Sequence, residues 1–243
     1  MTPRFIVATL ACTLTLTAGV SHTGRADDTP ANLPGITVDR EAGHLDIDGI
    51  IAARDAYLEL IACTRGTKEH ESLVSMSATA QHTHLALVML GAKPGSPSRW
   101  VQDEKTGRWK GINPTGTPVR ITVLVRKDGR WIEQPLSTYI IRHEVTLIKD
   151  DGNVTETKRK EIPMGGDTFV FGGSKLTRKG DRTIYEADAE GNAIALVAFE
   201  DATLNWPTAL SHSNDYLEFY TNTDAIPPAG TPVKLRLRPL LRK

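Results

Sequence analysis

The alternation of apolar and polar residues predicts a chain built mainly of short β-strands. Leu45 and Ile47 alternate with Asp46 and Asp48, and the run at 119–125 reads Val-Arg-Ile-Thr-Val-Leu-Val. This period of two places one set of side chains in a core and the other set on the surface. Similar short runs are found at 35–38, 57–63, 72–76, 144–148, 169–171, 184–187, 194–199, 216–220 and 233–237.

Two pairs of these runs are expected to form antiparallel hairpins. The run at 57–63 is followed by Thr-Arg-Gly-Thr, and 72–76 is its expected return strand. The run at 184–187 is expected to pair with 194–199 through the turn Glu190-Gly191-Asn192.

One stretch predicts a helix. Residues 78–90 are rich in Ala and Leu, Gly91 supplies a C-cap, and Pro94 follows shortly after. The expected fold class is therefore α+β, a mainly antiparallel β-sheet with one packed helix near residues 78–90.

Residues 92–118 predict a long loop, because they are rich in Pro, Gly, Ser and charged residues. Trp100 and Trp109 are isolated aromatic residues within it. The tetrapeptide Gly-Thr-Pro-Val ends this stretch at 116–119 and occurs again at 230–233. In both places it precedes a β run, so we interpret it as two similar strand entries rather than as a duplication.

The first 26 residues predict a secretory signal peptide. Arg4 precedes a predominantly apolar run at 5–20, and small residues at Gly24 and Ala26 suit a signal peptidase. Cleavage after Ala26 leaves a flexible leader at 27–35 and an expected single domain at 36–240. The mature product is expected to be periplasmic or extracellular.

Two alternatives to ordinary cleavage are a retained membrane anchor and a lipid anchor at Cys12. The apolar run of 16 residues is short of the roughly 20 that a spanning helix needs. The run before Cys12 is also very short for a lipid attachment signal. No later apolar run has the length of a membrane span, so we expect no transmembrane segment in the mature chain.

The charge balance argues against a nucleic-acid-binding protein, and the hydrophobic content indicates a folded core. The full chain has 29 basic and 29 acidic residues, and cleavage removes Arg4 and Arg25, which leaves 27 basic residues. Such a balanced chain lacks the clustered positive charge that nucleic acid requires, so we expect no nucleic-acid partner. The 40% hydrophobic content is sufficient for a core.

The candidate site residues are Cys63 and the consecutive Lys68, Glu69, His70, Glu71 and Ser72. Cys63 is the only cysteine after residue 26, which excludes an internal disulfide and a four-thiolate cluster in the mature chain. Its place on an alternating run predicts a buried residue. The alternative is a nucleophile activated by His70 across the hairpin.

No familiar catalytic or metal motif is complete. His82 and His84 are two residues apart, so a helix directs them about 200° apart, and they cannot chelate one ion together unless the segment is extended there. Nothing in the spacing shows that His70 or His143 converges with either of them. A serine elbow is broken at 172–176, where Leu176 replaces the last glycine. We therefore expect no metal and no other cofactor.

Several separated motifs resemble the exported YdjY-domain proteins of bacteria, over about residues 36–239. In order they are Leu58-Glu59 with Cys63, then 65–72, 90–95, 169–174 and 226–233. The resemblance implies that Lys68 to Ser72 belongs to a common scaffold, and it implies no catalytic residues. A ferredoxin-like label carried by some relatives does not fit a mature chain with one cysteine.

The favoured interpretation is an exported, non-catalytic binding or interaction protein of the cell envelope, with a protein or small-molecule ligand. Its expected contact surface combines residues 68–72 with Trp100 and Trp109, because long loops with aromatic residues often bind ligands. The alternative is a hydrolase or metal-dependent enzyme using His70 with Glu69, Glu71, Ser72 or Cys63. That alternative requires two of these groups to meet at a concave pocket.

Overall fold

A computed structural model describes residues 33–151, 153–211, 213 and 216–241, and the compact unit begins at Leu33. The predicted signal peptide at 1–26, most of the leader at 27–35 and Cys12 lie outside the described residues. Within the described part, neither helix has the length and apolar character that crossing a membrane requires.

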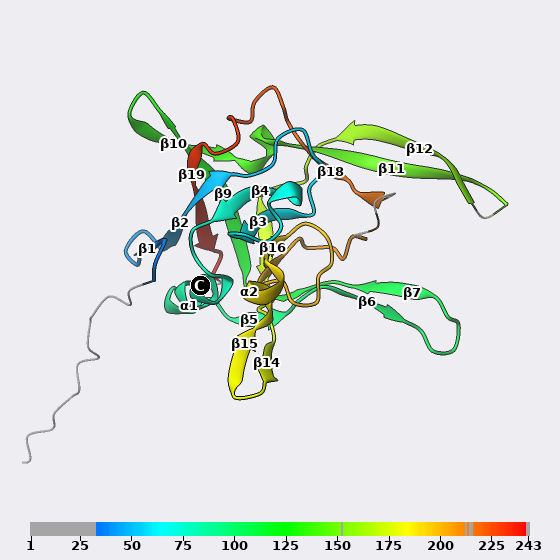
Figure 1. Cartoon of the computed structure of the whole chain (residues 1–243), viewed down its shortest axis with the longest axis horizontal. Helices are drawn as coiled ribbons and strands as arrows, with labels where there is room; N and C mark the ends of the chain where they lie inside the picture. The colour runs from blue at the N-terminus through cyan, green and yellow to red at the C-terminus, as the bar shows by residue number, and fades with distance from the viewer. Residues whose placement is uncertain (1–32, 152, 212, 214–215, 242–243) are drawn as a thin grey trace, which may run out of the picture. The chain divides into compact units, whose positions relative to one another are not determined.

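Eight strands form a sheet that closes on itself into a barrel, which the sequence pattern did not predict (Figure 1). Most neighbours are antiparallel, as expected. The order around the barrel is β2 (His44–Ile51), β19 (Pro232–Pro239), β9 (Pro118–Lys127), β13 (Thr168–Phe171), β17 (Leu204–Asn205), β16 (Asn192–Ala195), β3 (Leu60–Thr64) and β4 (Ser72–Met76), which pairs with β2 again.

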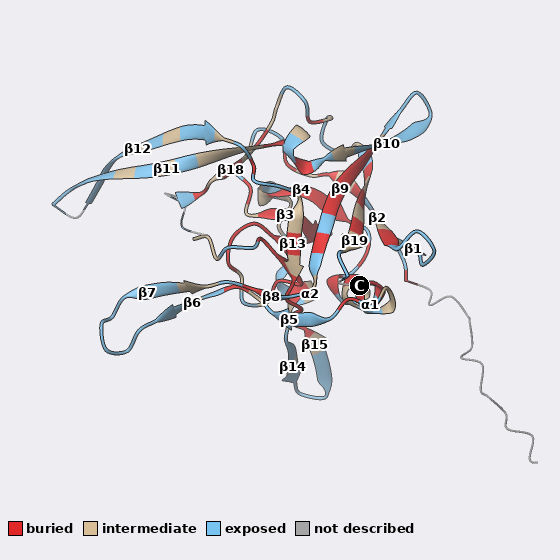
Figure 2. Ribbon diagram, turned by 180° about the vertical axis from the view of Figure 1, so that it is seen from behind, coloured by how far each residue is buried: buried red, intermediate tan, exposed pale blue. Residues whose placement is uncertain are grey.

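The remaining strands extend the barrel or project from it as hairpins (Figure 1). Figure 2 shows that buried residues gather in the barrel, whereas the hairpins are largely exposed. Two strands extend the barrel sheet: β1 (Ile36–Asp39), which pairs with β2, and β10 (Arg130–Pro135), which pairs with β9. The others are β11 (Ile140–Asp150) with β12 (Asn153–Ile162) and β18 (Phe219–Thr221), β14 (Leu176–Lys179) with β15 (Arg182–Tyr185), β5 (Pro94–Ser96) with β8 (Thr115–Gly116), and β6 (Arg99–Gln102) with β7 (Trp109–Ile112).

Strands β3 and β4 run parallel, and the antiparallel hairpin expected for them is wrong. Leu60 lies opposite Ser72, and Thr64 lies opposite Met76. Residues 65–71 therefore return along the whole length of β3, about 16 Å at about 3.3 Å per residue. Alternation of side chains is the same in parallel and antiparallel strands, so the sequence pattern could not distinguish the two arrangements.

The predicted helix is confirmed as α1 (Ala80–Met89). Thr79 is its N-cap, and the Thr79 side chain accepts a hydrogen bond from the His82 N–H at 3.0 Å. Gly91 follows the helix with φ of +85°, a conformation that favours glycine.

A second, short helix, α2 (Glu186–Glu190), was not predicted. The strand expected at 184–187 ends at Tyr185 and pairs with β14, so its expected pairing with 194–199 is wrong. The Asp188 carboxylate accepts hydrogen bonds from the N–H groups of Ala80 and Gln81, at 2.5 and 3.1 Å. This side chain thus satisfies backbone donors that the first turn of α1 leaves unpaired.

The stretch at 92–118 is not an irregular loop, because it contains strands β5 to β8. Strand β5 pairs with β8 near the barrel, and β6 pairs with β7 in a projecting hairpin. The two strands of this hairpin carry Trp100 and Trp109, whose packing is described below. Two short 3₁₀ turns complete the fold: η1 (Glu69–Glu71) and η2 (Leu136–Thr138).

Candidate functional site

The predicted site residues lie on the segment that crosses the outside of β3. Glu69, His70 and Glu71 form the turn η1, and Ser72 begins β4. The Ser72 hydroxyl donates a hydrogen bond to the Lys68 carbonyl at 2.7 Å. The position of this segment follows from the parallel pairing of β3 and β4, which requires the chain to travel back over β3.

Glu69 holds the crossover segment together. Its carboxylate accepts hydrogen bonds from the Gly66 N–H at 2.5 Å and from the Ser75 hydroxyl at 3.2 Å. Burial opposes ionisation of this carboxyl, but hydrogen bonds led by the one from Gly66 outweigh it and lower the Glu69 pKa. Glu69 is therefore a structural residue of the turn.

Cys63 and His70, which the alternative prediction pairs across a hairpin, lie in different environments. Cys63 is fully buried in a small cluster with Leu60 and Ala202, and burial raises the pKa of its thiol. The His70 side chain is 78% exposed, and its Nε2 lies 3.5 Å from a Glu71 oxygen. One group thus faces the interior while the other faces solvent.

The structure adds Glu59 to this group, a residue that sequence analysis did not single out. Burial and then the negative charge of Glu71 raise the Glu59 pKa from 4.5 to about 7, against the lowering effects of Lys68 and His70. The Lys68 Nζ lies 3.4 Å from Glu71 and 4.2 Å from the centre of the Phe199 ring. These groups come together only because β3 and the crossover segment are neighbours in space.

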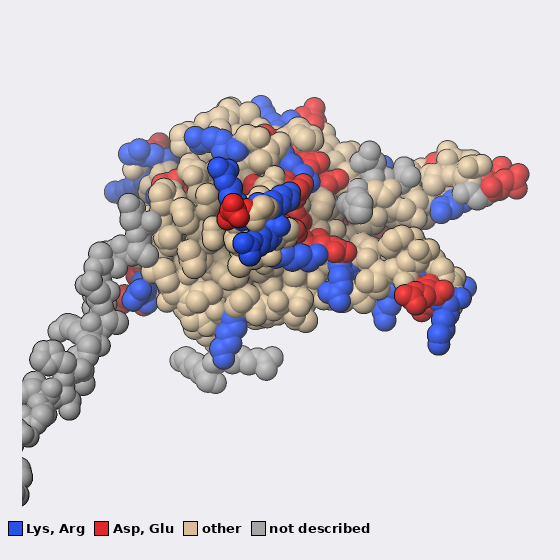
Figure 3. Space-filling model, turned by 60° about the horizontal axis from the view of Figure 1, so that its bottom comes forward, with Lys and Arg blue, Asp and Glu red and all other residues tan. Residues whose placement is uncertain are grey.

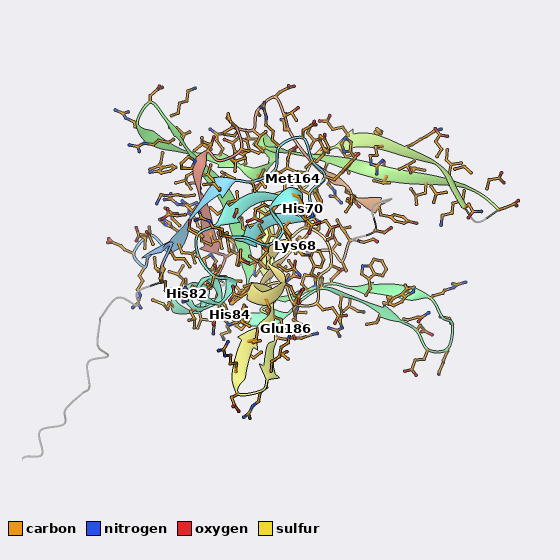
Figure 4. The ribbon with its side chains drawn as sticks, viewed as in Figure 1. Lys68, His70, His82, His84, Met164 and Glu186 are labelled. Atoms are coloured by element: carbon orange, nitrogen blue, oxygen red, sulfur yellow. The ribbon has the colours of Figure 1, made fainter. Side chains whose placement is uncertain are left out.

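The histidines are distributed over separate parts of the structure. Figure 4 shows His82 and His84 on α1, well away from Lys68 and His70. His143 lies on β11. Among the described residues, no three His, Cys, Asp or Glu side chains are placed to hold a metal ion together.

The β6–β7 hairpin places Trp100 and Trp109 on one face. Trp100 lies opposite Gly111, and Gln102 lies opposite Trp109, so the two indoles are diagonal neighbours. The Trp100 Nε1–H donates a hydrogen bond to the Leu210 carbonyl at 3.3 Å.

Gly111 allows the hairpin to lie closely against the segment at 206–211. A Cβ atom at Gly111 would be only 3.0 Å from the Ala209 carbonyl oxygen. The Ala209 N–H also donates a hydrogen bond to the Asn113 side chain at 3.0 Å. The base of the hairpin is thus fixed, while Trp109 extends beyond it and is 63% exposed.

An open, mainly apolar groove of about 820 Å³ is lined by the β6–β7 hairpin and by described residues between Ala209 and Glu218, and we call it the tryptophan groove. Its only acidic lining residue among those described is Glu218, which forms an ion pair with Arg142 at 2.8 Å. Its lining residues are Trp100, Trp109, Ala209, Leu210, Ser211, Ser213, Tyr216 and Glu218.

Comparison with protein-family models matches residues 36–238 to the YdjY domain. No curated protein and no solved structure matches the chain. The match covers the barrel, the crossover segment and the tryptophan groove together.

Proposed function

The chain belongs to the YdjY-domain family, and on that premise we propose that it is an exported, non-catalytic binding protein of the cell envelope. The tryptophan groove is the observation that carries this proposal. Exposed tryptophan and tyrosine side chains offer large, rigid contact areas at a low cost in conformational entropy. Trp109 and Tyr216 both line the groove and are 63% and 42% exposed.

The proposed ligand is a neutral oligosaccharide. The charge of Glu218 is balanced by Arg142, so the described lining offers no unpaired charge to a charged ligand. The lining instead combines aromatic faces with the hydroxyl groups of Ser211 and Ser213. A sugar ring has an apolar C–H face and hydroxyl edges, which is the same combination of chemistry.

Replacing Trp109 with alanine is expected to weaken oligosaccharide binding at least about tenfold, which corresponds to about 1.4 kcal/mol. The probe is a series of N-acetylglucosamine oligomers, measured by titration calorimetry, which does not depend on the lost fluorophore. Trp131→Ala is the matched control, because Trp131 is 40% exposed on the separate hairpin β9–β10. The control is expected to bind as the wild type does.

Two results would contradict this assignment of the groove. The first is equal weakening by Trp109→Ala and Trp131→Ala, which would indicate a general effect of losing surface tryptophan. The second is the absence of binding for every oligomer. Binding of an apolar peptide in place of the sugars would retain the groove but replace the proposed ligand class.

Export is a separate proposal with its own test. The full chain expressed in a bacterium is expected to yield a mature protein beginning at Asp27, as measured by intact mass. Ala26→Arg is expected to abolish this product, because signal peptidase requires a small residue before the cut. Ala31→Arg, five residues further on, is the control and leaves cleavage intact; a mature protein that retains residues 1–26 would disprove the proposal.

The position of the predicted catalytic groups gives the enzyme alternative no specific support. His70 projects into solvent, Cys63 is buried, and Glu69 and Ser72 are engaged in the hydrogen bonds of the crossover segment. We therefore propose that this segment serves the scaffold and that binding occurs at the hairpin.

A further inference from the structure

A second concave surface lies beside α1, between the segments at 94–99 and 172–175. This cleft has a volume of about 400 Å³, which is near the lower end of the range of small-molecule sites. The two segments are in close contact, since a Cβ atom at Gly172 would be 2.9 Å from the Pro97 Cα. His84 of α1 forms part of the cleft wall, and its Cε1 would be 3.3 Å from a Cβ atom at Gly173.

A chain of buried hydrogen bonds fixes the tautomer of His84. Thr203 is fully buried, and within the described structure its hydroxyl has a single side-chain partner, the Tyr185 hydroxyl at 3.1 Å. The arrangement in which Thr203 donates its proton to Tyr185 satisfies this buried donor, whereas the reverse arrangement leaves the Thr203 proton without an acceptor, which is costly. The Tyr185 oxygen also accepts a hydrogen bond from the Ser174 N–H at 3.1 Å.

With both of its acceptor positions used, the Tyr185 hydroxyl donates its own proton to the His84 Nδ1, 3.0 Å away. Burial lowers the pKa of His84 and favours a neutral ring. The remaining ring proton is then on Nε2. No described residue pairs with this N–H, so His84 is a hydrogen-bond donor available to a ligand.

Positively charged side chains also line the cleft that His84 borders. The Arg99 guanidinium makes no hydrogen bond or ion pair with another described residue, whereas Lys175 and Glu200 neutralise each other at 3.2 Å. Lys175 also precedes the β14–β15 hairpin, which adds Arg178, Lys179 and Arg182. Figure 3 shows Lys and Arg side chains, with some Asp and Glu among them, on the side of the molecule from which this hairpin projects.

We propose that the cleft between residues 94–99 and 172–175 binds a small oxyanion, a molecule carrying a carboxylate or phosphate group. Arg99 supplies the compensating charge, and the His84 Nε2–H supplies a directed hydrogen bond. An arginine suits this role because its planar group binds two oxygens of one anion. The surrounding basic hairpin raises the local concentration of anions.

The test uses the mature protein labelled with ¹⁵N, with inorganic phosphate and acetate as separate probes at constant ionic strength. Imidazole ¹H–¹⁵N correlation spectra, with the His84 signals assigned by His84→Gln, are expected to show a proton on Nε2 and saturable shifts on addition of a probe. Arg99→Gln is expected to weaken binding about tenfold or more, the effect of losing one hydrogen bond to a charged group. Arg108→Gln, at the exposed end of the same β6–β7 hairpin, is the matched control.

Saturation by phosphate alone assigns a phosphorylated ligand, and saturation by acetate alone assigns a carboxylate ligand. The proposal is overturned if neither anion shifts the His84 signals saturably, or if Arg108→Gln weakens binding as much as Arg99→Gln does. The cleft and the tryptophan groove share no lining residue, so failure at one surface leaves the proposal for the other intact.

Discussion

Replacing Gly116 with alanine is expected to lower the free energy of unfolding by about 3 kcal/mol or more. A Cβ atom at Gly116 would lie 2.0 Å from the Phe171 carbonyl oxygen, and the residue has φ of +133°. The backbone cannot withdraw easily, because the Phe171 N–H donates a hydrogen bond to the Thr117 carbonyl at 2.9 Å. Both steric overlap and backbone strain therefore act at one position.

Gly230 is the matched control, because it begins the second copy of Gly-Thr-Pro-Val. It has φ of +84°, but no neighbouring atom lies within 4 Å of the added Cβ. Gly230→Ala is therefore expected to lower the free energy of unfolding by about 1 kcal/mol, through backbone strain alone. Urea unfolding followed by circular dichroism compares the two variants; equal losses would show that the packing of Gly116 against Phe171 is wrong.

Replacing Glu59 with glutamine is expected to stabilise the protein above pH 7 by about 2 kcal/mol. The displacement of the pKa from 4.5 to about 7 corresponds to about 3 kcal/mol at full effect. Contact of the side chain with solvent reduces this figure. The wild type carries the cost of ionising a carboxyl that is partly buried beside Glu71, whereas glutamine carries no charge.

The direction of the pH dependence follows from proton binding. Between pH 4.5 and 7 the unfolded chain has lost the Glu59 proton while the folded chain keeps it, so this residue makes stability fall as pH rises. Glu59→Gln and the wild type are expected to have equal stability below pH 4.5 and to diverge up to pH 7. Glu161→Gln is the control, because Glu161 is an exposed residue on β12. If the difference in free energy of unfolding between Glu59→Gln and the wild type is the same at every pH, the raised pKa of Glu59 is refuted.

Local sequence signals were sufficient for several elements. The Ala- and Leu-rich stretch that Gly91 follows was correctly predicted to be a helix, because the C-cap depends on nearby residues. The helix begins at Ala80 rather than at Ala78, because the Thr79 side chain caps it. The strands expected at 35–38 and around Leu45 and Ile47 are also present, as β1 and β2. Cys63 is buried as predicted, but all five residues of β3 are buried, so alternation is not the cause.

The pairing of strands that are distant in the sequence could not be predicted from local patterns. The alternating pattern is the same for parallel and antiparallel neighbours, so nothing in it indicated that β3 and β4 run in the same direction. Closure of the barrel depends on the pairing of β2 with β4. A Cβ atom at Gly49 would be 2.6 Å from the Val74 side chain, so glycine at this position allows β2 and β4 to pair closely. The need for glycine is apparent only when the partner strand is known.

The same distinction between local pattern and distant contacts applies to the candidate sites. Residue type and local pattern were enough to identify the segments with candidate site residues, Lys68 to Ser72 and the tryptophans of 92–118, because both are properties of neighbouring positions. The folded structure was needed to show that the first segment connects two parallel strands, that Trp109 borders a groove, and that His84 contacts Tyr185. His84 and Tyr185 alone are 101 positions apart in the sequence, and packing around the closed sheet sets their geometry.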